Sequence, residues 1–292
     1  MILGRLSHRT PIRRAAAAWR GLTCLLLPAF AALGGIGELR AQLEPYNPGP
    51  GEPVTLELVL AVDVSSSVSV EEFDLQMKGF ADAFRDPSVI SAISASGPNG
   101  VAVAMIQWSD NRRQQVAVDW ARLTDESTIE AFAVEIDQTP RFLDGGGTAI
   151  GGAIAFALSQ LDRNGYEGTR QVIDISGDGR ANQGAQPESL RDVAILQGVT
   201  INGLAILNED SHVAAYYRNS VIGGPGAFVM TANDYEAFAQ AIIQKLVKEI
   251  GAVPVVEAPR GAPGTSPGQP ESANQTAQNS LPGAGNPGIL LD

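Results

Sequence analysis

Cysteine is almost absent from this chain, and histidine is rare. The 292 residues contain one cysteine, Cys24, and two histidines. Cys24 lies in an N-terminal apolar stretch that we expect to be removed, so the mature protein is predicted to contain no disulfide bond. His212 is then the remaining histidine, and we expect it at the surface or at the start of a helix. Catalysis by a cysteine nucleophile or by a Ser–His pair therefore lacks its parts.

Basic residues are scarce relative to acidic ones. The chain has 20 Lys and Arg against 32 Asp and Glu, which gives a net charge of −12. Six of the arginines fall within the first 41 residues, where Glu38 is the only acidic residue, so the rest of the chain is more acidic still. Such a surface repels phosphates and anionic lipid head groups. We expect no nucleic-acid binding, and no membrane binding once the N-terminal segment has been removed.

Long apolar runs are absent after the N-terminus. There, Arg-bearing residues 5–20 precede the apolar segment 21–37, and Ala41 offers a small residue for cleavage. We therefore predict a signal peptide over residues 1–41 and an exported protein, periplasmic or extracellular. An uncleaved anchor is the alternative, but a proline and three glycines interrupt a run that is short for a membrane span.

Composition divides the remainder of the chain into three parts. Residues 42–52 are rich in Pro and Gly and are predicted to be a linker. Residues 53–250 form one domain, in which apolar strands and amphipathic helices alternate. Residues 251–292 are dominated by Pro, Gly, Ala, Gln, Asn and Ser, so we expect them to be disordered.

The alternation of strands and helices predicts an α/β fold with a doubly wound, mostly parallel sheet. One antiparallel edge strand is expected, because the second and third strands are joined by a short polar turn. Strands are predicted at 54–64, 100–109, 115–120, 169–176, 199–207 and 227–231. Helices are predicted at 69–86, 127–137, 148–161, 187–197, 211–220 and 234–250.

Oxygen-bearing side chains follow three of these segments. Asp63, Ser65 and Ser67 are spaced by two residues at the end of the first strand, Asp178 follows a later buried strand, and Thr148 follows a run of glycines. In an open α/β sheet, ligands bind outside the carboxyl ends of the strands. Hard oxygen donors without Cys or His suit Mg²⁺, Mn²⁺ or Ca²⁺ better than Zn²⁺. The sequence therefore predicts a divalent-metal site at this edge.

The order DxSxS, then Thr, then Asp resembles the metal-ion-dependent adhesion site of von Willebrand factor A domains, and the likeness covers residues 53–250. The segments LVLAVDVSSSV, VIDISGDG, TINGLAI and YYRNSVIGGPGAF are also similar to a bacterial family of exported von Willebrand A-like proteins without an assigned activity. The likeness implies that Ser65 and Ser67 bind the metal directly, and Thr148 directly or through water. It implies that Asp63 and Asp178 act largely through waters and hydrogen bonds.

A site of this kind would bind a partner and catalyse nothing. An ion with few anionic ligands keeps an open position, which an Asp or Glu of a protein partner can fill. The partner that we expect is therefore a protein that presents an acidic residue.

Two other functions are consistent with parts of the pattern. The segment GDGRAN around Asp178 resembles a loop of haloacid dehalogenase-like phosphatases, in which Asp63 would be the nucleophile. Against this, Ser65 stands where that family has an acid, and no lysine lies between Lys78 and Lys245 to steady a phosphoaspartate. The second alternative is a metal-free structural domain, because Ser-rich turns also cap helices.

Overall fold

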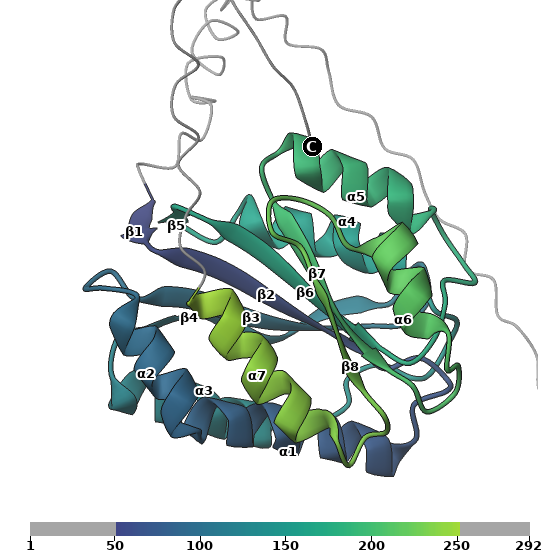
Figure 1. Cartoon of the computed structure of the whole chain (residues 1–292), viewed down its shortest axis with the longest axis horizontal. Helices are drawn as coiled ribbons and strands as arrows, with labels where there is room; N and C mark the ends of the chain where they lie inside the picture. The colour runs from purple at the N-terminus through teal and green to yellow at the C-terminus, as the bar shows by residue number, and fades with distance from the viewer. Residues whose placement is uncertain (1–50, 252–292) are drawn as a thin grey trace, which may run out of the picture. The chain divides into compact units, whose positions relative to one another are not determined.

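The structure is a computed structural model of the chain, and it describes residues 51–251. The predicted signal peptide (1–41), most of the predicted linker (42–52) and nearly all of the predicted tail (251–292) lie outside these residues. Within them, one six-stranded sheet carries helices on both faces (Figure 1). None of the helices in this part of the chain has the length and apolar character needed to cross a membrane.

The six-stranded sheet is parallel except at one edge. Its strand order is β4-β3-β2-β6-β7-β8, and β4 is antiparallel to β3. This arrangement confirms the predicted α/β fold, including the single antiparallel edge strand. The strands are β2 (Leu56–Asp63), β3 (Val101–Trp108), β4 (Gln114–Leu123), β6 (Gln171–Gly177), β7 (Thr200–Ile206) and β8 (Val229–Ala232).

Strand β2 lies at the centre because it is apolar on both sides. All eight of its residues are buried. Leu58 and Leu60 face one hydrophobic core, whereas Val59 and Ala61 face the other. A strand with both faces covered is typical of a parallel sheet between two helical layers.

The first helical layer packs on the Leu58 side of the sheet (Figure 1). Phe80 of α1 meets Phe238 of α7 edge to face, with ring centroids 5.1 Å apart, and Phe84 meets Phe132 of α3 at 5.0 Å. These two pairs stabilise the packing of α1 against α7 and against α3. Its helices are α1 (Val70–Arg85), α2 (Pro87–Ala95), α3 (Glu126–Asp137) and α7 (Phe238–Ile250).

Side-chain caps fix where α1 and α2 begin. Ser69 and Glu72 form a capping box at the start of α1. Helix α1 ends at Arg85, one residue before the predicted end, but the sequence analysis missed α2. Asp86 caps the new helix and Pro87 occupies its first turn, so the dipeptide that ends one helix also starts the next.

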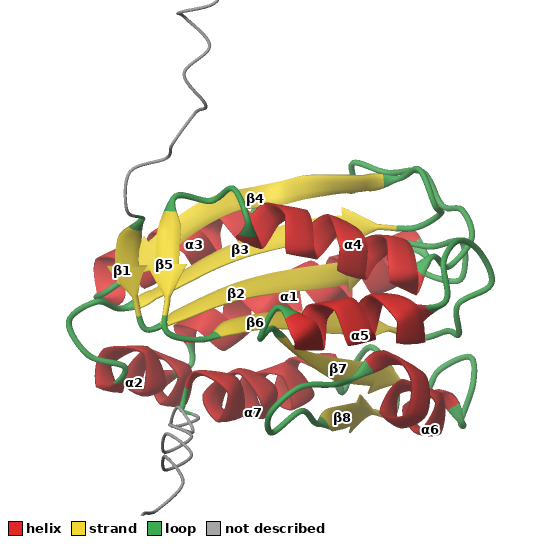
Figure 2. Cartoon of the chain, turned by 90° about the horizontal axis from the view of Figure 1, so that it is seen from above, coloured by secondary structure: helices red, strands yellow, loops and turns green. Residues whose placement is uncertain are grey.

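The second layer covers the opposite face of the sheet (Figure 2). It consists of α4 (Ile150–Leu161), α5 (Pro187–Leu196) and α6 (Val213–Tyr216). The single helix predicted over 211–220 is wrong in detail. Helix α6 gives way to a π-helical turn, Tyr217–Val221, which turns the Tyr217 side chain into the core.

Two further differences from the sequence analysis concern short segments. Strand β1 (Glu52–Val54) begins at the last residue of the predicted linker and pairs in parallel with β5 (Tyr166–Gly168). Neither strand was predicted, because three residues are too few to show a pattern. Helix α7 begins at Phe238 and not at Asp234, which leaves Tyr235 outside the helix.

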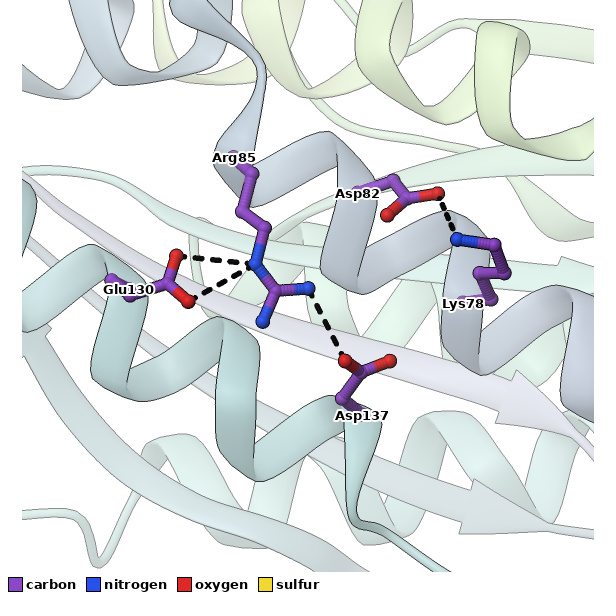
Figure 3. A network of polar contacts seen from close by, with 5 residues as sticks. All are labelled: Lys78, Asp82, Arg85, Glu130 and Asp137. Carbon is purple, nitrogen blue, oxygen red and sulfur yellow. Dashed lines mark hydrogen bonds and ion pairs between the residues drawn. The ribbon is translucent and has the colours of Figure 1, made fainter.

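An exposed ionic network links α1 to α3 (Figure 3). Arg85 lies 3.1 Å from Glu130 and 3.3 Å from Asp137, while Lys78 pairs with Asp82 one turn away on α1. Solvent and salt screen exposed ion pairs, so they contribute little to stability. The buried Phe84–Phe132 pair holds the two helices together.

A second ionic cluster is buried between α7 and the sheet. The Lys245 ammonium lies 2.5 Å from carboxylate oxygens of both Asp174 and Glu249, and all three side chains are buried. Asn202 of β7 donates to Glu249 over 2.8 Å. Burial and the charge of Glu249 raise the pKa of Asp174. Asp174 thus has a structural role, with Lys245 as its partner.

Candidate metal centre

The candidate site lies where the strand order reverses. The chain leaves central β2 on one side for β3 and returns on its other side as β6. Val62 pairs with Ser176, so Asp63 and Asp178 follow neighbouring strand ends. In open α/β sheets this switch point is the common ligand position.

Hydrogen bonds join four of the five predicted residues. Asp63 Oδ1 accepts from the backbone N–H of Ser65 over 2.7 Å, and the hydroxyls of Ser65 and Ser67 lie 3.2 Å apart. The Ser67 hydroxyl donates to Asp178 Oδ1 over 2.8 Å, across 111 residues of sequence. The turn after β2 and the turn after β6 therefore form one cluster.

The glycine-rich loop brings Thr148 to the same edge. The Ser66 N–H donates to Gly146 O over 3.0 Å, so this loop lies against the turn after β2. A methyl group on Gly179 would lie 3.8 Å from Thr148 Oγ1, which places the threonine hydroxyl beside the residue that follows Asp178. The Thr148 N–H donates to Asn182 Oδ1 over 2.9 Å and holds the loop there. All five predicted residues thus lie at one edge of the sheet.

The two carboxylates carry negative charge into a buried region. Asp63 is fully buried, and its Oδ2 accepts no hydrogen bond from any residue that the structure describes. Burial and, after it, the charge of Asp178 raise the pKa of Asp63 to about 7. Burial also raises the pKa of Asp178, although hydrogen bonds from Ser67 and Tyr235 oppose the shift. A bound cation would relieve both effects.

The Oδ2 atom of Asp63 and the Tyr217 hydroxyl both lie beside Gly177. A methyl group on Gly177 would lie 2.8 Å from both Asp63 Oδ2 and the Tyr217 hydroxyl, so only glycine fits at this position. The Tyr217 hydroxyl is buried and, within residues 51–251, has no hydrogen-bond partner. The π-helical turn that inserts this tyrosine is of a kind often found at functional sites.

Three site residues escaped the sequence analysis. The Tyr235 hydroxyl donates to Asp178 Oδ2 over 3.1 Å, and Gln76 Nε2 donates to the Asp63 carbonyl over 3.3 Å. The Arg141 guanidinium binds backbone carbonyls of the turn after β2. Their partners lie 57, 13 and more than 70 residues away in sequence, so spacing gives no signal for them.

The donor set fits a hard divalent ion. Three hydroxyls and two carboxylates gather here, and the described residues contain no group of three or more His, Cys, Asp and Glu that could hold a metal by themselves. The buried, unpartnered oxygen of Asp63 is the feature that a cation would satisfy. Ser65, Ser67 and Thr148 offer hydroxyl ligands, and Asp63 and Asp178 offer charge and hydrogen bonds.

A protein-family model covers most of the described part of the chain. The model of a family described as "Protein of unknown function (DUF1194)" matches residues 53–254. The chain belongs to the DUF1194 family. No curated protein shows significant sequence similarity to it.

Several solved structures are similar in fold to this chain. Proximal thread matrix protein 1 from the mussel byssus has a TM-score of 0.50 and 17% identity, over 69% of this chain and 47% of that one. A second structure of the same protein, with a zinc-occupied MIDAS motif, has a TM-score of 0.49, 16% identity, and coverage of 68% and 48%. The von Willebrand factor type A protein from Catenulispora acidiphila has a TM-score of 0.48, 16% identity, and coverage of 68% and 43%.

The likeness is one of fold. This chain spans less than half the length of each of those three chains, and the identities are low. The α/β architecture of this chain is therefore shown by its own sheet, whereas its ligand has to be argued from its own residues.

Proposed function

We propose that this chain is an exported, divalent-cation-dependent protein-binding module. Asp63, Ser65, Ser67, Thr148 and Asp178 would hold Mg²⁺, Mn²⁺ or Ca²⁺. A protein partner would be recognised through an Asp or Glu side chain. The proposal names a class of partner and no reaction, because the site offers ligands for an ion and no arranged nucleophile and base.

The observation that supports this proposal most strongly is the buried Oδ2 of Asp63, which accepts no hydrogen bond from the described residues. A carboxylate buried without a full set of donors is costly. Asp63 Oδ1 accepts a hydrogen bond from the Ser65 N–H, whereas Oδ2 has no hydrogen-bond partner in the described part of the chain. Asp178, which adds more negative charge, is joined to it through the two serines. A cation at the serine hydroxyls would balance this charge.

Ser67 and Tyr235 have different roles beside Asp178. The Ser67 hydroxyl donates a hydrogen bond to Asp178 Oδ1 over 2.8 Å, so the Ser67 oxygen still has a lone pair to offer to an ion. Tyr235 holds the second oxygen of Asp178 at 3.1 Å and so fixes the direction of that carboxylate. When bound, a divalent ion with mostly neutral ligands supplies an open coordination position for a carboxylate.

The surface around the site suits a protein ligand. Ser66 and Ser67 are exposed beside the buried Asp63 and Ser65, so the hydroxyl cluster reaches solvent. Phe142 and Val70 are also exposed, with 44% and 61% of their surface accessible. Phe142 follows Arg141 on its loop, and Val70 is the first residue of α1, after the turn that follows β2. A protein partner whose carboxylate binds the ion would gain further contact area from these apolar side chains.

The first experiment measures metal binding by the chain. Mg²⁺ or Mn²⁺ should raise the melting temperature of the wild type by mass action, because only the folded chain assembles the five ligands. Asp63→Ala should abolish the rise. An equal rise in both proteins, or no rise in either, would contradict the metal assignment.

The second experiment concerns the partner. Immobilised wild type should retain an envelope protein in Mg²⁺, release it in EDTA, and fail to retain it as Asp63→Ala. Acidic substitutions in the retained protein should then identify the carboxylate. Hydrolysis of a generic phosphomonoester that is lost in Asp63→Asn would instead support the phosphatase alternative.

A further inference from the structure

We propose that Arg141 is a positioning residue that holds the turn after β2 in its metal-binding shape before any metal arrives. The inference rests on the proposed function, since it concerns the same site. It assigns a task to a side chain that neither the motif nor the family likeness includes.

A single guanidinium binds three carbonyls of this turn. Arg141 Nη2 donates to Val64 O over 2.8 Å and to Ser65 O over 3.1 Å, and Nη1 donates to Val68 O over 2.8 Å. Charge-assisted hydrogen bonds of this kind are stronger than neutral ones. The planar fork of arginine spreads its donors over separate nitrogens, whereas a lysine ammonium carries its three donors on a single nitrogen. The bonded carbonyls enclose the stretch that carries Ser65 and Ser67.

Arg141 is itself held from a rigid strand. Gln107 of β3 is buried; its Nε2 donates to Pro140 O over 2.8 Å, and its Oε1 accepts from the Phe142 N–H over 2.8 Å. The backbone on both sides of Arg141 is therefore fixed by one side chain of the sheet. A clamp that is anchored in this way transmits the geometry of β3 to the turn.

The clamp also joins the two segments that supply the hydroxyls. The loop that contains Arg141 continues to Gly146, which accepts from the Ser66 N–H, and then to Thr148. Arg141 and Gly146 thus bind the turn after β2 from two points of one loop. Serine-rich turns have competing local hydrogen bonds, so without the clamp the turn would sample other shapes. Ligands that are already in place lose less entropy on binding.

An opposing effect has to be separated from this one. The charge of Arg141 acts against the raised pKa of Asp63, so it is felt at the site, and a positive charge repels a metal ion. Arg141→Lys keeps the charge but loses the fork. Arg141→Gln loses both.

The test uses the full chain and Mn²⁺ as the probe. Titration calorimetry of the wild type, Arg141→Lys and Arg141→Gln gives the Mn²⁺ affinities. Loss of a residue that orients metal ligands weakens binding by about 10- to 100-fold, and we expect this in both variants. Amide hydrogen exchange without metal is the second readout, and the Ser65, Ser66 and Val68 amides should exchange faster in both variants than in the wild type.

Arg85→Lys is the matched control. Arg85 also bridges two elements, but it lies at the far end of α1, 16 residues long, from the turn after β2 (Figure 3). We expect its Mn²⁺ affinity and the exchange of the three amides to equal those of the wild type.

Three outcomes decide the matter. Unchanged Mn²⁺ affinity in Arg141→Lys overturns the proposal, even if the variant is less stable, because Arg141 would then be only structural. Unchanged affinity in Arg141→Lys with tighter binding in Arg141→Gln also overturns it, in favour of charge repulsion alone. A wild type that binds no Mn²⁺ refutes the proposed function itself, and the exchange data still report whether Arg141 shapes the turn.

Discussion

Strand β2 carries a buried carboxylate at each end, and the two are treated in opposite ways. Glu57 lies near the amino end and Asp63 at the carboxyl end. Six residues separate them, about 20 Å along a strand, and an even spacing places them on the same face. Both are completely buried. They differ only in what surrounds their oxygens.

Glu57 has donors for both oxygens. Its Oε1 accepts from the Gly168 N–H over 2.6 Å and from Gln171 over 3.3 Å, and its Oε2 accepts from Asn164. These neutral donors come from β5 and from the segments on either side of it. The β1–β5 pair, which the sequence did not predict, thus closes the amino end of the sheet around one carboxylate.

Asp63 has donors for one oxygen. Ser65 satisfies Oδ1, but Oδ2 has no partner in residues 51–251, and Asp178 adds a second negative charge nearby. The same fold that completes the shell of Glu57 leaves this one open. The comparison teaches that burial of a carboxylate does not by itself mark a site. The incomplete hydrogen-bonding shell beside hydroxyls is what distinguishes Asp63 and what leads us to propose a site there.

Removing a buried counter-ion should give the largest effect. Lys245→Met leaves Asp174 and Glu249 buried without a cation, and we expect the free energy of unfolding to fall by about 3–5 kcal/mol. Chemical denaturation measures it. Lys78→Met is the control, since Lys78 and Asp82 are exposed and should change stability little. Equal stabilities of the two variants would show that buried charge costs less here than we argue.

Replacing Glu57 by its amide should come next. In Glu57→Gln, the new amide N–H₂ faces the donors of Asn164, Gly168 or Gln171. A buried donor without an acceptor lowers the free energy of unfolding by about 2–3 kcal/mol. The rise in melting temperature with Mn²⁺ should persist, because the site lies at the other end of β2. If Glu57→Gln abolished that rise, the two ends would not be independent.

A methyl group on Gly177 should have a smaller effect. Gly177→Ala places Cβ 2.8 Å from Asp63 Oδ2 and from the Tyr217 hydroxyl, and overpacking of this kind costs about 1–2 kcal/mol. Gly179→Ala, whose methyl meets Thr148 at 3.8 Å, should be nearly neutral. Thermal unfolding distinguishes the two, and a larger loss in Gly179→Ala would contradict the packing that we describe.

The smallest change in stability should come from Asp63→Asn. The amide keeps Oδ1 as the acceptor for the Ser65 N–H and removes a buried charge, so without metal the free energy of unfolding should differ from wild type by less than about 1 kcal/mol. The Mn²⁺-induced rise should disappear. A metal-free loss as large as that of Glu57→Gln would mean that Asp63, like Glu57, is a structural carboxylate.

The sequence predicted the parts of this site that depend on strand order. Asp63 and Asp178 were expected at one edge because parallel strands end there, and the glycines before Thr148 indicated a loop that approaches closely; that β2 and β6 are neighbours is seen only in the structure. Tyr235 was missed because it was assigned to helix α7, and Arg141 because its acceptors are backbone carbonyls more than 70 residues away. Lys245 lay beside the apolar stripe of α7, and nothing in its spacing indicates Asp174 as a partner.

Anomalous diffraction from crystals grown with Mn²⁺ tests the central claim most directly. The account predicts one Mn²⁺ peak bounded by the hydroxyls of Ser65, Ser67 and Thr148 in the wild type, and no peak there in Asp63→Ala. A wild-type crystal with no Mn²⁺ at this edge, or with the ion bound only elsewhere, would contradict it.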